Sequence, residues 1–291
     1  HFVDDDAAGD DAAQDVLHAI ARDNGFDHVA FQFEPIAAAL HYESSVQGEE
    51  LVLIVDIGGG TSDFSILRVS PAGRTKANRD SDILASHGIR VGGTDFDRLL
   101  SVAQVMPALG LGSLINNGKN PMPLHYYYDL ATWHRINTLY AGRALIELKE
   151  IRFDADEPLV LDRLIRVIEE RTGHSIAMAV ETAKIELSDT LATPIYLTEF
   201  IGLDTGATRA MFDAVVTKPV VRITEAIAVV LAQAGVDAGQ IGTVFMTGGS
   251  SSLPVVQTAV RACLPGVRVA TGDLLGSVGT GLALDAARRF A

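Results

Sequence analysis

The sequence predicts an α/β fold, in which buried strands alternate with helices. The stretch 51–55 is continuously apolar and rich in branched residues, which suits a strand buried inside a sheet, and 241–246 is also predicted to form a buried strand. Glycines follow both stretches closely, and the segments between them carry apolar residues at helical spacing. The chain has 291 residues, of which 48% are hydrophobic, so it can build one large domain or two moderate ones.

The other elements are arranged around the stretch 51–69, which is predicted to form a strand, a tight turn and a return strand over 64–69. The turn holds three consecutive glycines, whose amides can converge on an anion. Alone, such a run favours a flexible hairpin tip, but acids on both sides favour a phosphate site with magnesium. It is not a P-loop, because no Lys-Ser/Thr pair follows the glycines. The candidate residues are Asp56, Gly58, Gly59, Gly60, Thr61 and Asp63.

The segment before this hairpin is predicted to contain two helices and a short strand. His1–Val3 has the composition of a strand end, and residues 12–22 show helical spacing of apolar positions. A strand is expected over 28–33. Glu34-Pro35 then opens an alanine-rich helix, since proline suits a first turn. Locally, Glu34 is as compatible with a capping carboxylate as with a site residue.

After the hairpin, a strand is expected over 83–87, and Gly92-Gly93 leads into a helix that runs towards Met106. Residues 107–128 are predicted to form a loop, because glycine, asparagine and proline are frequent there. A cluster of aromatic residues follows, which is more typical of anchors for an irregular insert than of a base-stacking surface. Its members are Tyr126, Tyr127, Tyr128, Trp133 and His134.

Helices are expected over 136–152, 158–171 and 175–187. On the last helix Glu181, Lys184 and Ser188 are three and four residues apart, so they share one face. Most such patterns are exposed, ion-paired faces. The elements expected next are a strand over 193–200, a helix that opens at Thr208 and a long helix through Leu231.

The second apolar strand runs into Gly248-Gly249, and a helix ending near Cys263 follows. Such a turn allows a flat ligand to approach, and serine hydroxyls can contact ribose or phosphate. An ordinary strand-to-helix turn explains the pattern equally well. The candidate residues are Gly248, Gly249, Ser250 and Ser252. A short strand over 267–269 and a helix ending at Arg288-Arg289 are expected after them.

Composition excludes several classes of partner. The formal net charge of −14 argues against nucleic acid or an anionic membrane as the main partner. No apolar run approaches the length needed to cross a membrane. Cys263 is the only cysteine, so no internal disulfide can form and a reducing, cytoplasmic location is expected.

Several of these motifs, in this order, resemble those of the ATPase domain of Hsp70 chaperones, in the actin/hexokinase/Hsp70 superfamily. They are Glu34-Pro35, D-I-G-G-G-T-S-D at 56–63, G-G-T-D-F-D at 92–97, the face of Glu181, Lys184 and Ser188, and the turn at 248–252. The resemblance is nearest to divergent, short bacterial Hsp70-like proteins that lack a peptide-binding domain. It implies an actin-like ATPase (ribonuclease H-like) fold, with two lobes around a nucleotide cleft.

The resemblance also implies roles for the candidate residues. Asp56 and Asp63 would hold Mg²⁺ through water and orient the attacking water, and Glu34 would complete the water shell of the metal. Thr61 and the glycine triplet would bind the phosphates of ATP or ADP, and the first amides of Gly92-Gly93 would meet the γ-phosphate. Glu181, Lys184 and Ser188 would hold the adenosine, with Ile185 where the family usually has a stacking arginine. Client or co-chaperone proteins are the further partners implied.

The resemblance predicts how the chain is divided. Residues 1–48 would belong to the first lobe, to which 273–291 return. Residues 49–91 and 218–272 would form the core of the second lobe, and 92–217 an insert that caps it. The first lobe is expected to be incomplete, because the family's first phosphate hairpin and the lysine after it have no counterpart. We therefore expect this chain alone to hydrolyse ATP little or not at all. The alternatives are a small-molecule kinase of the same superfamily and a non-catalytic scaffold with this fold.

Overall fold

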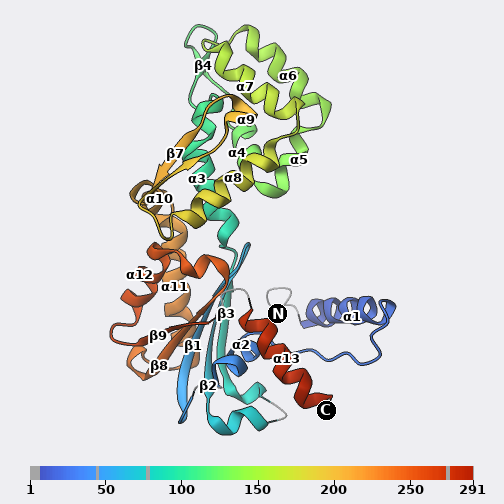
Figure 1. The fold of residues 1–291 in the computed structure, drawn as a ribbon, viewed down its shortest axis with the longest axis vertical. Helices are drawn as coiled ribbons and strands as arrows, with labels where there is room; N and C mark the ends of the chain where they lie inside the picture. The colour runs from blue at the N-terminus through green and yellow to red at the C-terminus, as the bar shows by residue number, and fades with distance from the viewer. Residues whose placement is uncertain (1–6, 44–45, 77–78, 273–275, 291) are drawn as a thin grey trace.

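The computed structural model describes residues 7–43, 46–76, 79–272 and 276–290, so the strand expected at His1–Val3 lies outside the described residues. A five-stranded sheet with the strand order β3–β2–β1–β8–β9 forms its centre (Figure 1). β1 runs parallel to β8 and antiparallel to β2, and β8 runs parallel to β9. The strands are β1 (Glu50–Ile57), β2 (Ser62–Val69), β3 (Ile83–Ile89), β8 (Ile241–Thr247) and β9 (Arg268–Thr271).

β1 is buried on both faces, as its continuous apolar sequence predicted. Alternate side chains of a strand point to opposite faces of the sheet. Leu53, Val55 and Ile57 therefore enter one core, which they share with α11 (Thr217–Ala234) and α12 (Pro254–Cys263). Val52 and Ile54 enter a second core on the other face, which they share with α2 (Glu34–Glu43).

The second face of the sheet is covered by a tight crossing of α2 with α13 (Ser277–Arg289). A Cβ atom added to Gly281 of α13 would lie on top of the carbonyl oxygen of Ala37 in α2. The two helices pack this closely because both present small residues at the crossing. α1 (Ala7–Asp23) stands apart from the sheet beside this pair, and Val16, Leu17 and Ile20 on it are 43–58% exposed (Figure 1).

A buried group of charges joins α2 to the connection between β2 and β3. The guanidinium of Arg79 donates to both carboxylate oxygens of Glu43, at 2.7 and 2.8 Å, and to Asp82 at 2.6 Å. Arg79 and Glu43 are 2% and 0% exposed. Each charge has a partner, which is the condition for burying charges without a large cost in stability.

A helical body extends from the edge of the sheet where β1 ends (Figure 1). α3 begins at that edge of the sheet, and α8 packs against α3. Two short hairpins, β4–β5 and β6–β7, complete the body. Its helices are α3 (Gly93–Gln104), α4 (His125–Ala131), α5 (Ile136–Leu139), α6 (Gly142–Phe153), α7 (Pro158–Glu169), α8 (Gly173–Glu186), α9 (Thr198–Ile201) and α10 (Arg209–Val215), and its strands are β4 (Leu114–Ile115), β5 (Asn120–Pro121), β6 (Ala192–Ile195) and β7 (Thr205–Thr208).

Three sequence-based expectations about single elements are wrong. Residues 28–33 form no strand, because no neighbouring strand in the described structure offers them a ladder of hydrogen bonds. The helix expected over 136–152 is two helices, with a break at Tyr140-Ala141. The strand expected over 193–200 ends at Ile195, and Asp204 then caps α9 by accepting from the N–H groups of Leu197 and Thr198.

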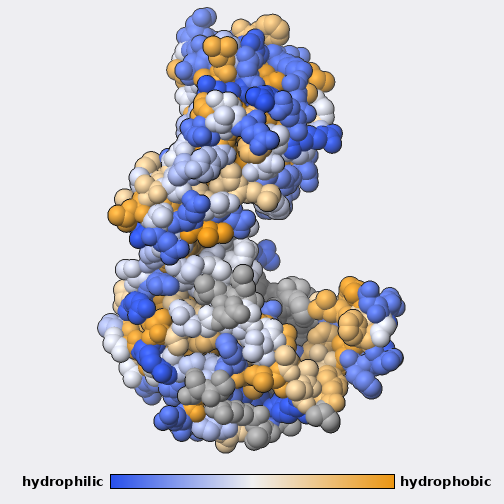
Figure 2. Space-filling model, in the orientation of Figure 1, coloured by the Kyte–Doolittle hydropathy of each residue, from blue (hydrophilic) through white to orange (hydrophobic). Residues whose placement is uncertain are grey.

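The loop expected over 107–128 is only partly irregular, since it contains β4, β5 and the beginning of α4. Figure 2 shows a deep concavity between the helical body and the part of the molecule that carries α1 and α13. No helix in the described part of the chain is both long and apolar enough to cross a membrane.

Candidate functional site

The tip of the β1–β2 hairpin is held in place by the first turn of α3. The N–H of Gly93 donates to the carbonyl oxygen of Gly58 at 2.9 Å. The N–H and the hydroxyl of Thr94 both donate to the carbonyl oxygen of Gly59, at 2.7 and 2.9 Å. Within the tip, Gly58 N–H donates to the carbonyl oxygen of Thr61 at 3.0 Å. The carbonyl groups of Gly58 and Gly59 therefore point towards α3.

The N–H groups of Gly59, Gly60 and Thr61 have no acceptor among the described residues. These three residues are exposed. Consecutive free amides at an exposed turn are the donor set of an anion-binding concavity. The hairpin tip is thus a fixed loop whose unused donors face away from α3.

Gly92 and Gly93 position this loop rather than offering free amides. The N–H of Gly92 donates to the carboxylate of Asp95 at 3.2 Å, and that of Gly93 is used by Gly58. A Cβ atom on Gly92 would lie 2.6 Å from the backbone of Gly59 and Gly60. The amides of Gly92 and Gly93 thus both have acceptors within the protein. The unused amides nearest to them belong to the hairpin tip.

The two glycine-rich turns lie side by side because β1 and β8 are parallel neighbours, whose carboxyl ends meet at one edge of the sheet. Gly248 has a φ of +80°, and a Cβ on it would lie 2.5 Å from a carboxylate oxygen of Asp56. A Cβ on Gly93 would lie 2.6 Å from the hydroxyl of Ser250. The hydroxyls of Ser251 and Ser252 donate back to the carbonyls of Gly248 and Gly249, both at 2.8 Å. A short 3-10 helix over Gly249–Ser252 follows.

Acidic side chains gather below the hairpin tip. Asp56 and Asp63 are paired across β1 and β2. Burial, together with the charges of Glu34 at the start of α2 and of Asp63, raises the pKa of Asp56 to about 6. The hydroxyl of Thr61 donates to Asp63 at 3.2 Å. A cation at this place would relieve the repulsion between the carboxylates.

The spacing of these acids decides how a metal ion could be held. Among the described residues, no three acidic, histidine or cysteine side chains lie close enough to be direct ligands of one ion. Mg²⁺ keeps several waters in most protein sites and uses one or two carboxylates. The set of Asp56, Asp63 and Glu34 therefore fits a hydrated Mg²⁺ and does not form a closed metal cage.

α8 brings Lys184 to the same edge of the sheet. The ammonium of Lys184 is 2.9–3.0 Å from both carboxylate oxygens of Asp97 on α3, and it would be 3.4 Å from a Cβ on Gly93. Burial raises the pKa of Asp97 to about 6 although the charge of Lys184 lowers it. The exposed-face interpretation is wrong for Lys184, which is only 6% exposed.

The other residues of the face predicted on α8 are not buried beside Gly93 as Lys184 is. Glu181 lines a small cavity of about 170 Å³ between α3 and α8, together with Asp97 and Trp133. Ile185 is 58% exposed. Ser188 lies beyond the end of α8, and its carbonyl oxygen accepts from the guanidinium of Arg209 at 2.9 Å. Lys184 and Glu181 thus border the glycine turns and α3, while the structure gives Ser188 a contact with α10.

Sequence reasoning missed two residues of this site, Thr94 and Asp97. Both lie in the G-G-T-D-F-D segment at 92–97. Asp97 is one helical turn after Gly93, so it lies on the same side of α3 as the glycine. That spacing is a signal from which its contact with the site could have been predicted.

Comparison with protein families gives one match, to the model described as Hsp70 protein, over residues 10–111 and 166–271. The first segment contains the hairpin, its acids and the start of α3, and the second contains α8 and the turn at Gly248. The stretch 112–165, which includes α4 to α6, lies between the two matched segments.

Proposed function

Because this chain belongs to the Hsp70 protein family and has the actin-like ATPase fold, as its motifs predicted, we propose that it binds ATP or ADP together with Mg²⁺ at the edge where β1 and β8 end. The observation that carries this proposal is the hairpin tip. Three unused N–H groups stand there next to a group of acids whose charges repel each other. Phosphate oxygens can accept hydrogen bonds from the unused N–H groups, and the Mg²⁺ that accompanies the phosphate supplies positive charge next to the acids.

The phosphate end of the nucleotide would be bound by the tip itself. The amides of Gly59, Gly60 and Thr61 would donate to phosphate oxygens. Asp56 and Asp63 would hold Mg²⁺ through its waters, with Glu34 as a third acceptor for that shell. Bound there, Mg²⁺ would neutralise phosphate charge. Asp56 would need to be ionised for this role, and its pKa of about 6 allows that at neutral pH.

The adenosine end would lie between α8 and the turn after β8. Lys184 and Glu181 border that side of the site, with Gly248, Gly249, Ser250 and Ser252 on the other. Ile185 offers an exposed apolar surface where a stacking guanidinium would give a cation–π contact. We therefore propose weak discrimination between ATP and GTP.

Hydrolysis of the nucleotide would rest on positioning and charge stabilisation, with Asp56 or Asp63 orienting the attacking water. A change in the angle between the lobes would couple this to a chaperone-type task in the cytoplasm, with client or co-chaperone proteins as partners.

A thermal unfolding series tests the proposal. The midpoint is measured with ATP, ADP and GTP, each with and without Mg²⁺, and with Mg²⁺ alone. A ligand that binds only the folded state stabilises it by about 2.7 kcal/mol at a hundred times its Kd. We expect a rise with ATP or ADP plus Mg²⁺ that exceeds the rise with either component alone. Equal midpoints in all samples would contradict nucleotide binding and favour the scaffold alternative.

A further inference from the structure

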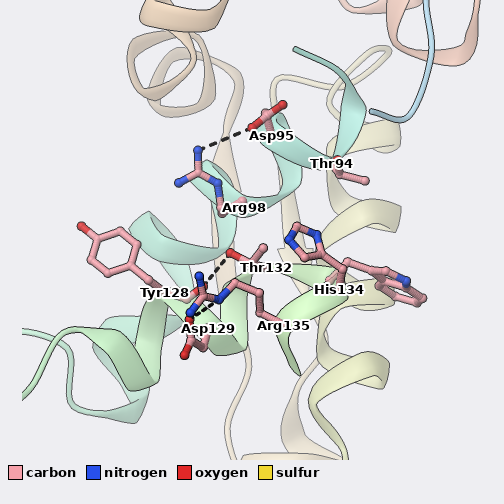
Figure 3. A pocket seen from close by; sticks show the side chains of 9 residues that line it. Thr94, Asp95, Arg98, Tyr128, Asp129, Thr132, His134 and Arg135 are labelled. Carbon is pink, nitrogen blue, oxygen red and sulfur yellow. Dashed lines mark hydrogen bonds and ion pairs between the residues drawn. The ribbon is translucent and has the colours of Figure 1, made fainter. Parts of the chain in front are cut away.

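A separate cavity of about 370 Å³ lies on the helical body, where the stretch outside the matched family segments meets α3. Figure 3 shows side chains from α3, α4 and the turn after α4 around it. Its volume is in the range of small-molecule sites. Its lining residues are Thr94, Asp95, Arg98, Tyr128, Asp129, Thr132, Trp133, His134 and Arg135.

Hydrogen-bond donors exceed acceptors in this cavity. Arg98 comes no closer than 3.6 Å to Asp95, and it makes no hydrogen bond to a described residue. Arg135 uses its Nε on Asp129 at 2.6 Å, which leaves both terminal nitrogen atoms without an acceptor among the described residues (Figure 3). Two guanidinium groups with unused donors are the usual means of binding a carboxylate or phosphate.

Two carboxylates that line the cavity balance the charges of the arginines but leave many of their N–H donors unused. Asp129 pairs with Arg135, and its side chain is only 14% exposed. Asp95 accepts from the N–H of Gly92 at the start of α3 and forms a long ion pair of 3.6 Å with Arg98. The donors that these two ion pairs leave unused belong to side chains that line the cavity.

Two exposed aromatic side chains also line this cavity. Tyr126 and Tyr127 are 2% and 0% exposed, so they anchor the insert as the sequence analysis expected. Tyr128 and Trp133, in contrast, are 43% and 48% exposed and line the cavity. Exposed rings next to free guanidinium groups suit a ligand that has an anionic group on a flat apolar body.

We infer that this cavity, which we call the insert cavity, binds a small anionic molecule whose carboxylate or phosphate is held by Arg98 and Arg135 and whose apolar part lies against Tyr128, with Trp133 as a further residue of the lining. Thr94 belongs both to its wall and to the contact that holds Gly59, so the insert cavity adjoins the hairpin tip. The inference does not depend on nucleotide binding, because none of the proposed contacts uses the glycine turns.

Trp133 makes a direct test possible, because it is the only tryptophan in the sequence. Its fluorescence is recorded during titrations of the wild-type chain with phenyl phosphate, benzoate and phenol. We expect a saturable change with phenyl phosphate or benzoate and none with phenol, and the stronger of the two anions identifies the anionic group. No saturable change with either anion, or an equal change with phenol, would overturn the inference.

Substitutions of the two arginines test whether the anion binds in the insert cavity. Arg98→Gln and Arg135→Gln remove one guanidinium each from partly exposed positions, so the fold should persist, and circular dichroism checks it. We expect each to weaken the anion's apparent Kd by about tenfold, the scale of a lost charge-assisted hydrogen bond. Arg143→Gln is the control, since its side chain is 89% exposed on α6 and lines no part of the cavity. An anion response that survives both test variants would come from another site and overturn the inference.

Discussion

Asp56 shows at the scale of one residue how a binding site can conflict with stability. It follows five apolar residues near the end of β1, and its neighbours Glu34 and Asp63 carry the same charge. A folded protein without ligand has nothing to gain from ionising such a group. Strain of this kind persists where the site needs the charge for a ligand.

Replacing Asp56 should therefore stabilise the ligand-free chain at neutral pH. Folding raises the pKa of Asp56 from its ordinary value near 4 to about 6. Between these two values the unfolded chain has lost a proton that the folded chain keeps, so this group lowers stability as the pH rises through that window. Asp56→Asn cannot ionise, and we expect it to be more stable than the wild type at pH 8, with the difference shrinking towards pH 4. Urea denaturation at both pH values measures this.

The exposed Asp189 provides the matched control, because Asp189→Asn makes the same chemical change away from other acids of the site. We expect it to follow the wild type at both pH values. If Asp56→Asn were no more stable than the wild type at pH 8, burial and the neighbouring acids would not oppose the ionisation of Asp56.

Individual site residues could be predicted from the sequence only where a motif surrounds them. The glycines and acids of the hairpin are adjacent along the chain, so their proximity follows from one turn. Lys184 and Asp97 are 87 residues apart, and only the packing of α8 on α3 brings them together. The spacing on α8 alone indicated an exposed face, because it contains no information about the partner helix.

At the scale of elements, the crossing of α2 with α13 depends on one missing side chain. We expect Gly281→Ala to destabilise the chain by about 3 kcal/mol, the upper end of typical overpacking effects, because the new methyl would collide with the backbone of α2. Chemical denaturation measures the loss.

Gly279 lies on the same helix, and a Cβ there would have no atom within 4 Å. Gly279→Ala should therefore stabilise the chain slightly, by about 0.5–1 kcal/mol, since alanine favours helix more than glycine does. Similar losses in both variants would show that helix conformation, and not the contact with Ala37, sets the cost.

Elements that depend on a distant partner were the least predictable. Residues 28–33 have the composition of a strand, but a strand needs a neighbour, and the described structure provides none beside them. The stretch 193–200 is similar in composition, and its second half turns into α9 because Asp204 binds the helix start. β1 was predicted correctly because both faces of the sheet are covered there, so residues 51–55 are apolar without interruption, and most residues of β8 are buried in the same way.

At the scale of the whole molecule, the order of the motifs carried most of the information. Two strands that each lead into glycines predict one shared edge if they are parallel neighbours, and the topology has them so. The insert cavity could not be predicted in this way. Tyr128 and Trp133 belong to the same aromatic run as Tyr126 and Tyr127, and only the fold separates the exposed rings from the buried ones.

The central claim is that the hairpin tip, held by α3, binds the phosphates of a nucleotide. Calorimetric titration of the chain with ADP and Mg²⁺ tests it most directly, with two glycine variants for comparison. Gly92→Ala would place a Cβ against Gly59 and Gly60 and displace the tip, whereas Gly239→Ala adds a Cβ in open space. We expect saturable binding to the wild type and to Gly239→Ala, and binding weakened by about tenfold or more in Gly92→Ala, the scale of one lost charge-assisted hydrogen bond. Equal affinity in all three proteins, or no binding to the wild type, would contradict the claim.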